Sequence, residues 1–191
     1  MGTVFVDNIK HQSSQGSGTI TVGASGEKVD LGTGVSGGTL TNIPAFHVFE
    51  TTDQTSVTAN TWTTVQMDDT LFDTDSGFAN DTYTIPTGKA GKYYFYAATR
   101  VLSSAAVNYL KRSFVRLLRT RDSTDTSMIQ GGIDIRSNPA YQNSIKISAI
   151  LDCQAGDVYK IQGFGDVTSG YVTFANNSTQ TYFGAFRIIG A

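Results

Sequence analysis

The feature that most constrains the fold is a two-residue alternation of apolar and polar side chains in short segments. Residues 145–151 show it most clearly, because apolar side chains occupy every second position. Successive side chains of a strand point to opposite faces, so this segment is predicted to form a strand with one apolar face. Comparable segments recur from residue 44 onward. They are residues 45–50, 60–67, 92–98, 158–161, 171–174 and 182–189.

Strands at this spacing predict an all-β fold of antiparallel sheets, either a sandwich or a barrel. Composition agrees, because Val, Ile, Thr, Tyr, Phe and Trp make up 74 of the 191 residues, against eight Leu and two Glu. A helical bundle is close to excluded, and a Rossmann-like fold is disfavoured. Residues 107–121 are ambiguous between a helix and a strand. We favour a strand that runs into a turn at Asp122 and Ser123.

The chain changes character near Pro44. Residues 1–43 contain nine glycines and one aromatic residue, whereas residues 44–191 contain the other twenty aromatic residues. We therefore predict an attachment or shaft segment over 1–43 and a head domain over 44–191. Short alternating pairs such as Val4 and Val6 predict strands that need neighbours, because a lone short strand is unstable in water. The alternative is a flexible Gly/Ser/Thr tail.

Charge is distributed unevenly along the head. Residues 44–99 contain seven acidic and two basic residues, whereas residues 100–121 contain six basic residues and no acidic one. One interpretation is a charged strand pair that faces an acidic neighbour. The other is a patch for an acidic virion partner or an anionic cell-surface polymer. The candidate patch residues are Lys111, Arg112, Arg116, Arg119 and Arg121.

The sequence offers no catalytic set, so we expect no enzyme, no cofactor and no metal. Two histidines cannot form a three-histidine zinc site, and Cys153 has no context that would activate its thiol. Residues 32–37 match a dinucleotide-binding glycine pattern, but the following residues cannot form the helix it requires. Residues 73–77 are rich in Asp but are predicted to form a polar turn. The net charge of −2 argues against nucleic acid, and no segment is long enough to predict membrane insertion.

A spaced pattern in the head resembles a known family signature. Met67, Asp73, Phe78, Ile85 and Gly91 are followed by aromatic residues at 93 and 95, at the intervals of the complement subcomponent q globular head. Residues 151–159 resemble that family's Gly-Asp turn with its flanking strands, and residues 182–186 resemble the closing strand of tumour necrosis factor relatives.

This resemblance implies a jelly-roll sandwich that associates as a homotrimer. It also implies that the closing strand lies near the three-fold axis, with Tyr182 as the best axial candidate. The candidates for the trimer interface or the core are Tyr93, Phe95, Tyr182, Phe183 and Phe186.

Residues 1–43 resemble, more loosely, the virion-attachment ends of phage fibre and spike proteins. The resemblance lies in a short strand that ends in Asp-x-Ile, and it makes Val4, Val6 and Ile9 the candidates for virion anchoring. It implies contact with other virion proteins through 1–43.

We therefore predict a non-enzymatic homotrimeric virion protein, a tail fibre or spike that attaches to the host surface, with a surface glycan as ligand. It would be assembled in the host cytoplasm and lie on the particle surface. The alternatives are a capsid decoration or cement protein and a secreted bacterial adhesin.

Overall fold

The computed structural model describes residues 43–104 and 107–188, and it places thirteen strands there. In chain order they are β1 (Ala45–Phe49), β2 (Gln54–Val57), β3 (Thr63–Thr64), β4 (Asp69–Asp73), β5 (Phe78–Ala79), β6 (Thr82–Thr84), β7 (Gly91–Ser103), β8 (Leu110–Arg121), β9 (Thr124–Asp134), β10 (Gln142–Cys153), β11 (Val158–Val167), β12 (Val172–Phe174) and β13 (Tyr182–Arg187). The early strands are short, and β7 to β11 are five long strands of 10 to 13 residues each.

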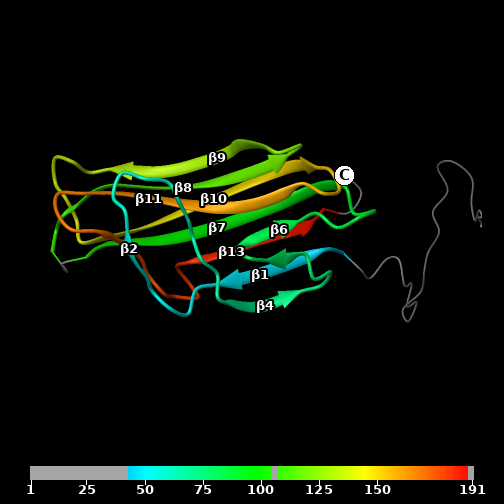
Figure 1. Cartoon of the computed structure of the whole chain (residues 1–191), viewed down its shortest axis with the longest axis horizontal. Coiled ribbons are helices and arrows are strands. Elements are labelled where there is room, and N and C mark those ends of the chain that lie inside the picture. Colours follow the sequence, from blue (N-terminus) through cyan, green and yellow to red (C-terminus); the bar gives the residue numbers. More distant parts are fainter. Residues whose placement is uncertain (1–42, 105–106, 189–191) are drawn as a thin grey trace, which may run out of the picture. The chain divides into compact units, whose positions relative to one another are not determined.

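These strands form two antiparallel sheets (Figure 1). In the first sheet, β7 is central: β10 pairs with one edge, while β13 and β12 pair with the other. This sheet continues from β13 to β1 and β4, and from β12 to β2. The second sheet has the order β5-β6-β11-β8-β9, and β3 also pairs with β11. Within the described residues, no helix is long and apolar enough to span a membrane.

The core lies between the two sheets and is rich in aromatic rings. The predicted apolar face of residues 145–151 is confirmed, because Ile145 and Ile147 are buried while Lys146 and Ser148 are exposed. Rings from different strands meet in this core: the centroids of Phe46 and Tyr83 lie 4.0 Å apart, and those of Phe95 and Tyr159 lie 4.4 Å apart. The apolar residues whose alternation predicts the strands therefore also form the core.

The ambiguous segment 107–121 is a strand from Leu110 onward, as favoured from the sequence. Its backbone pairs with β11 along one edge and with β9 along the other, which explains why the extended form wins over a helix. The predicted turn at Asp122 and Ser123 is also confirmed. Both residues have positive φ angles, 49° and 62°, as a two-residue type I′ hairpin turn requires.

The strand predicted at 60–67 is much shorter than expected, and those predicted at 45–50, 171–174 and 182–189 are shorter by one or two residues. Of residues 60–67, only β3 is a strand, because Asn60 takes a positive φ of 59° and the chain contacts β11 through separated hydrogen bonds. Val65 and Met67 are buried there, while Trp62 lies on the outside of the second sheet. The closing strand ends at Arg187 rather than at residue 189.

The first and last strands meet at one end of the domain. The backbone N–H of Arg187 donates to the Pro44 carbonyl at 2.9 Å, so β1 begins where β13 ends (Figure 1). Long loops close the opposite end. The Ser104 N–H donates to the Tyr171 carbonyl there at 3.0 Å, and Leu110 pairs with Ala140.

Candidate interaction surfaces

The outward side of the first sheet carries a continuous group of aromatic side chains, here named the aromatic face. Strand alternation explains its position: on β7, Tyr93 and Phe95 point into the core, so Tyr94 and Tyr96 point outward. Phe72 on β4 and Phe186 on β13 remain 43% and 45% exposed. The members of the aromatic face are His47, Phe49, Phe72, Tyr94, Tyr96, Tyr182 and Phe186.

His47 is central to this face. Its Nδ1 and the Tyr96 hydroxyl are hydrogen-bonded at 3.0 Å, and its ring centroid lies 5.7 Å from both the Tyr96 and the Tyr182 rings. Gly184 sits between His47 and Tyr96 in the strand register. A Cβ at Gly184 would lie 2.4 Å from Tyr96 Cζ, so the glycine permits this packing. Burial lowers the pKa of His47 and raises the pKa of Tyr96.

The structure separates the five predicted interface or core residues into two groups. Tyr93, Phe95 and Phe183 are at most 1% exposed and belong to the core, whereas Tyr182 and Phe186 lie on the aromatic face. The sequence prediction does not include the other five members of the face, which are His47, Phe49, Phe72, Tyr94 and Tyr96. The aromatic residues of β7 alternate between the two faces of the sheet, so the sequence indicates that Tyr94 and Tyr96 share one face. The sequence does not indicate whether that face points inward or outward.

The predicted basic patch is also divided. Arg121 binds the buried Asp157 through two hydrogen bonds of 2.6 and 2.5 Å, and Lys111 and Arg112 share Asp166 at 3.1 and 2.9 Å. Burial alone would raise the pKa values of Asp157 and Asp166, but these hydrogen bonds hold both below the usual range. Three of the five cations therefore face acidic neighbours, one directly before β11 and one on it, which favours the first interpretation of the charge pattern.

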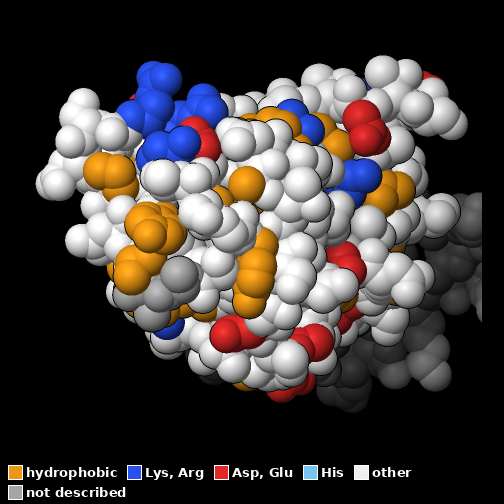
Figure 2. All heavy atoms as spheres, turned by 60° about the vertical axis from the view of Figure 1, so that its left-hand side comes forward, with side chains coloured by type: hydrophobic (Ala, Val, Ile, Leu, Met, Phe, Trp, Pro, Cys, Tyr) orange, Lys and Arg blue, Asp and Glu red, His pale blue; other side chains and the backbone are white. Residues whose placement is uncertain are grey.

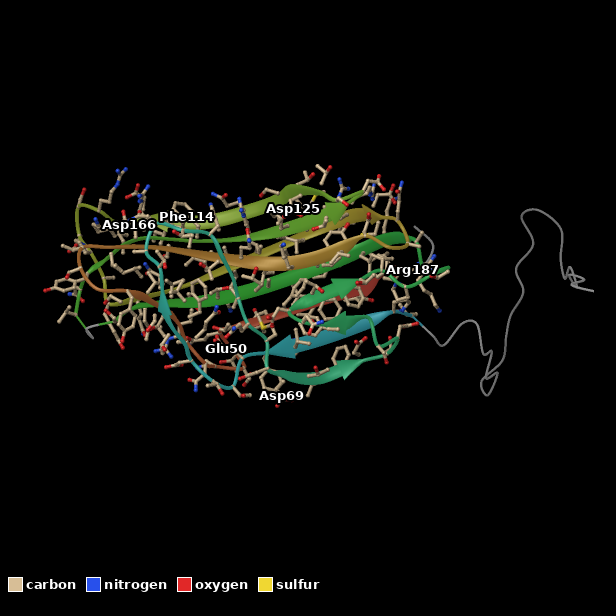
Figure 3. The ribbon with its side chains drawn as sticks, viewed as in Figure 1. Glu50, Asp69, Phe114, Asp125, Asp166 and Arg187 are labelled. Atoms are coloured by element: carbon tan, nitrogen blue, oxygen red, sulfur yellow. The ribbon has the colours of Figure 1, made fainter. Side chains whose placement is uncertain are left out.

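Lys and Arg side chains gather at one corner of the loop-bearing end, with acidic atoms among them (Figure 2). Figure 3 places Asp166 toward this end, with Phe114 beside it, and Arg187 toward the opposite end. The positive charge at this corner is therefore largely paired.

A second aromatic group lies on the outward side of the second sheet and is here named the Trp62 platform. The Trp62 ring centroid lies 5.4 Å from that of Phe164 and 6.4 Å from that of Phe114. The Arg116 guanidinium stacks 4.3 Å above the Trp62 ring, and its Nε and Nη2 donate to the Gln162 side-chain oxygen at 2.9 and 2.6 Å. The platform consists of Trp62, Phe114, Arg116, Gln162 and Phe164.

The described residues contain no cluster of potential metal ligands, and their single cysteine is buried. No group of three or more His, Cys, Asp or Glu side chains there could hold a metal ion. Burial raises the pKa of Cys153 to about 11, so its thiol is protonated at neutral pH. Residues 73–77 form the predicted polar turn, in which the Asp73 carboxylate accepts the Phe78 N–H at 2.8 Å. The anchoring candidates Val4, Val6 and Ile9 and the glycine pattern at 32–37 lie outside the described residues.

Comparison with known proteins identifies the fold. The globular domain of the zebrafish complement 1qA protein superposes with a TM-score of 0.53 at 19% identity, over 76% of this chain and 97% of that one. Murine APRIL superposes with a TM-score of 0.56 at 10% identity, over 77% of this chain and all of the other. The head is a jelly roll of the complement-q and tumour necrosis factor type. No family model and no curated protein match the sequence itself. The jelly roll predicted from the spaced signature is thus confirmed as a fold.

Proposed function

We propose that this chain forms a homotrimer through the aromatic face and serves as a non-enzymatic virion protein that attaches a particle to its host. The exposed aromatic side chains on the first sheet are the observation that carries the assembly. Contiguous exposed apolar surface of this kind marks protein interaction sites in soluble proteins. Three copies around one axis would bury Tyr182, Phe186 and Phe72 against neighbouring subunits.

Two further observations support the attachment role. The jelly roll resembles the heads of complement-q and tumour necrosis factor relatives, for which the sequence resemblance implies trimers. The chain enters this head beside the end of β13, which leaves the loops of the opposite end free to face a target (Figure 1). A trimeric head multiplies weak contacts to repeated surface ligands.

Light scattering after gel filtration tests the assembly. At micromolar concentration the full chain is expected to have the mass of three chains, and a clean monomer would contradict the proposal. Tyr182→Ala is expected to raise the dissociation constant of the trimer about tenfold or more, because it removes a large aromatic side chain from the interface. Tyr171→Ala is the matched control, since Tyr171 is 43% exposed but lies at the loop-bearing end.

Antibody labelling of particles tests the virion role. Signal at the tail is expected for a fibre or spike. Signal over the whole capsid would instead assign the trimer to the decoration class, and absence of the protein from purified particles would reject a virion role.

A further inference from the structure

We propose that the Trp62 platform is a binding site for an acidic sugar, that is, a saccharide unit that carries a carboxylate. The inference deepens the proposed attachment function by assigning its ligand class and its location on the head. It rests on the arrangement of three aromatic rings around one arginine on the outward side of the second sheet.

The rings of the platform are held in place by the sheet beneath them. Phe114 and Phe164 are directly paired on β8 and β11, with an interplanar angle of 64°. On the other side of Phe114, β9 contributes Gly132, where a Cβ would lie only 1.8 Å from the Phe114 ring. The Phe114 ring therefore lies over the backbone of β9 at Gly132, where any larger residue would place its Cβ in the space that the ring occupies. Trp62, Phe114 and Phe164 all remain partly exposed, so a ligand can reach them.

Arg116 and Arg119 differ from the other three cations of β8 in their charge balance, and of these two only Arg116 stacks on an aromatic ring in the described residues. Lys111, Arg112 and Arg121 each bind a carboxylate, whereas Arg116 forms no ion pair within the described residues. The acidic residue that most influences it, Asp125, is itself occupied by Thr120 and by Lys160 at 3.6 Å. The positive charge of Arg116 is thus available to a ligand.

The donor geometry of Arg116 suits a carboxylate. A guanidinium has five N–H donors, and Gln162 engages only Nε and one N–H of Nη2. Stacking on Trp62 and the bond to Gln162 fix the plane of the group, so the remaining donors are already oriented. Planar, preorganised donors favour bidentate carboxylate binding.

The two parts of the platform match the two parts of an acidic sugar. The Arg112 guanidinium lies over Phe164, 5.6 Å from its ring centroid, so an apolar ring face of the sugar can lie against the part of Trp62 that Arg116 leaves open. The carboxylate of the sugar can then pair with Arg116. Ligand sites commonly combine aromatic walls with a small number of placed polar groups in this way.

The chain provides its own probe for this site. Trp62 is the sole tryptophan, so intrinsic fluorescence reports on the platform directly. The full chain is titrated with a short oligogalacturonate and with sialyllactose, and the neutral controls are methyl-esterified oligogalacturonate and lactose. A saturable change with at least one acidic probe and none with its neutral counterpart is expected. No response to either acidic probe, or an equal response to the neutral ones, would overturn the proposal.

Substitutions of Arg116 locate the interaction. Arg116→Gln is expected to weaken binding of the acidic probe about tenfold, as the loss of a charge-assisted hydrogen bond predicts. Arg116→Lys keeps the charge but loses the planar fork, so a smaller loss is expected. The matched control is Arg136→Gln, which removes an exposed arginine paired with Asp134 and is expected to leave binding unchanged.

Trp62→Ala is measured by calorimetry, because the fluorescent group is lost, and it is expected to abolish detectable binding. Thermal unfolding of every variant checks that the head is folded. If Trp62→Ala unfolds the head, the Arg116 variants still decide the question, and wild-type affinity in Arg116→Gln would reject the site.

The outcomes also separate this inference from the proposed trimer. Binding is measured again on Tyr182→Ala, whose substitution lies on the opposite sheet. Retained binding in this variant would show that the site does not depend on the trimer interface, whereas a wild-type chain that binds the acidic probe as a monomer would retain the acidic-sugar site and reject the assembly. Trimers that bind none of the acidic probes would reject this site alone.

Discussion

At the residue scale, Glu50 is the least expected side chain in the head. It follows β1 directly, is only 1% exposed, and places one carboxylate oxygen 2.9 Å from the Gln54 N–H. Its second oxygen has no hydrogen-bond partner among the described residues. Burial, with a smaller contribution from Asp68 and other nearby acids, raises the pKa of Glu50 to about 8. Figure 3 shows Glu50 on the side of the domain that β1 and β4 form, near Asp69.

Glu50 is expected to make the head less stable as the pH rises. A carboxyl whose folded pKa lies above its unfolded value of 4.5 binds more protons in the folded state, so its contribution is complete below that value and is lost as the pH rises toward 8. Glu50→Gln should remove this dependence and raise stability at about pH 9 by on the order of a few kcal/mol. Denaturant unfolding across pH measures it. A Glu50→Gln profile that still falls with pH would contradict the assignment, and the exposed Asp69→Asn is the control.

At the element scale, β8 and β11 explain how one pair of strands serves both the core and the surface. Alternation on β8 places Val115 and Leu117 inside and Phe114 and Arg116 outside. On β11 the inward positions include Gly163, over which the ring of Phe174 lies. The glycine thus provides the space that a buried aromatic ring from β12 fills.

Gly163→Ala is expected to destabilise the head by about 1–3 kcal/mol, because overpacking a filled core forces strain. The new Cβ would lie 2.5 Å from Phe174 Cζ, and Phe174 is fully buried. Phe174→Leu shortens the opposing side chain, so the double variant should lose less stability than the sum of the two single changes. Strict additivity in denaturant unfolding would contradict the contact.

At the scale of the whole molecule, the aromatic face places a titrating group inside the proposed interface. His47 packs against Tyr96, Tyr182, Phe72 and Phe49, and burial already lowers its pKa in the single chain. Burial by neighbouring subunits would disfavour its charged form further.

The trimer is therefore expected to weaken in acid. The dissociated chain, in which the pKa of His47 already lies below 6.5, binds the proton more readily than the trimer does. The contribution of His47 to assembly is therefore complete above this lowered pKa and is lost as the pH falls through and below it. Sedimentation at a series of pH values measures this effect. His47→Gln, which cannot become charged, should assemble independently of pH over that range. A wild-type trimer whose dissociation constant is unchanged from neutral to mildly acidic pH would contradict the prediction.

The sequence by itself determined the all-β class, most strand positions and the turn at Asp122, because alternation and turn chemistry act over a few neighbouring residues. The jelly roll followed from the resemblance carried by the spaced signature. Only the tertiary structure decided which aromatic residues lie on the outer surface. The buried face of each sheet is the one against which the other sheet packs, and the sequence does not indicate which face that is. That is why Tyr93 and Phe95 belong to the core while Tyr94 and Tyr96 lie outside. The tertiary structure also decided which cations form ion pairs. Asp157 and Asp166 are distant in sequence from the cations of β8, and the pairing of β8 with β11 brings them together.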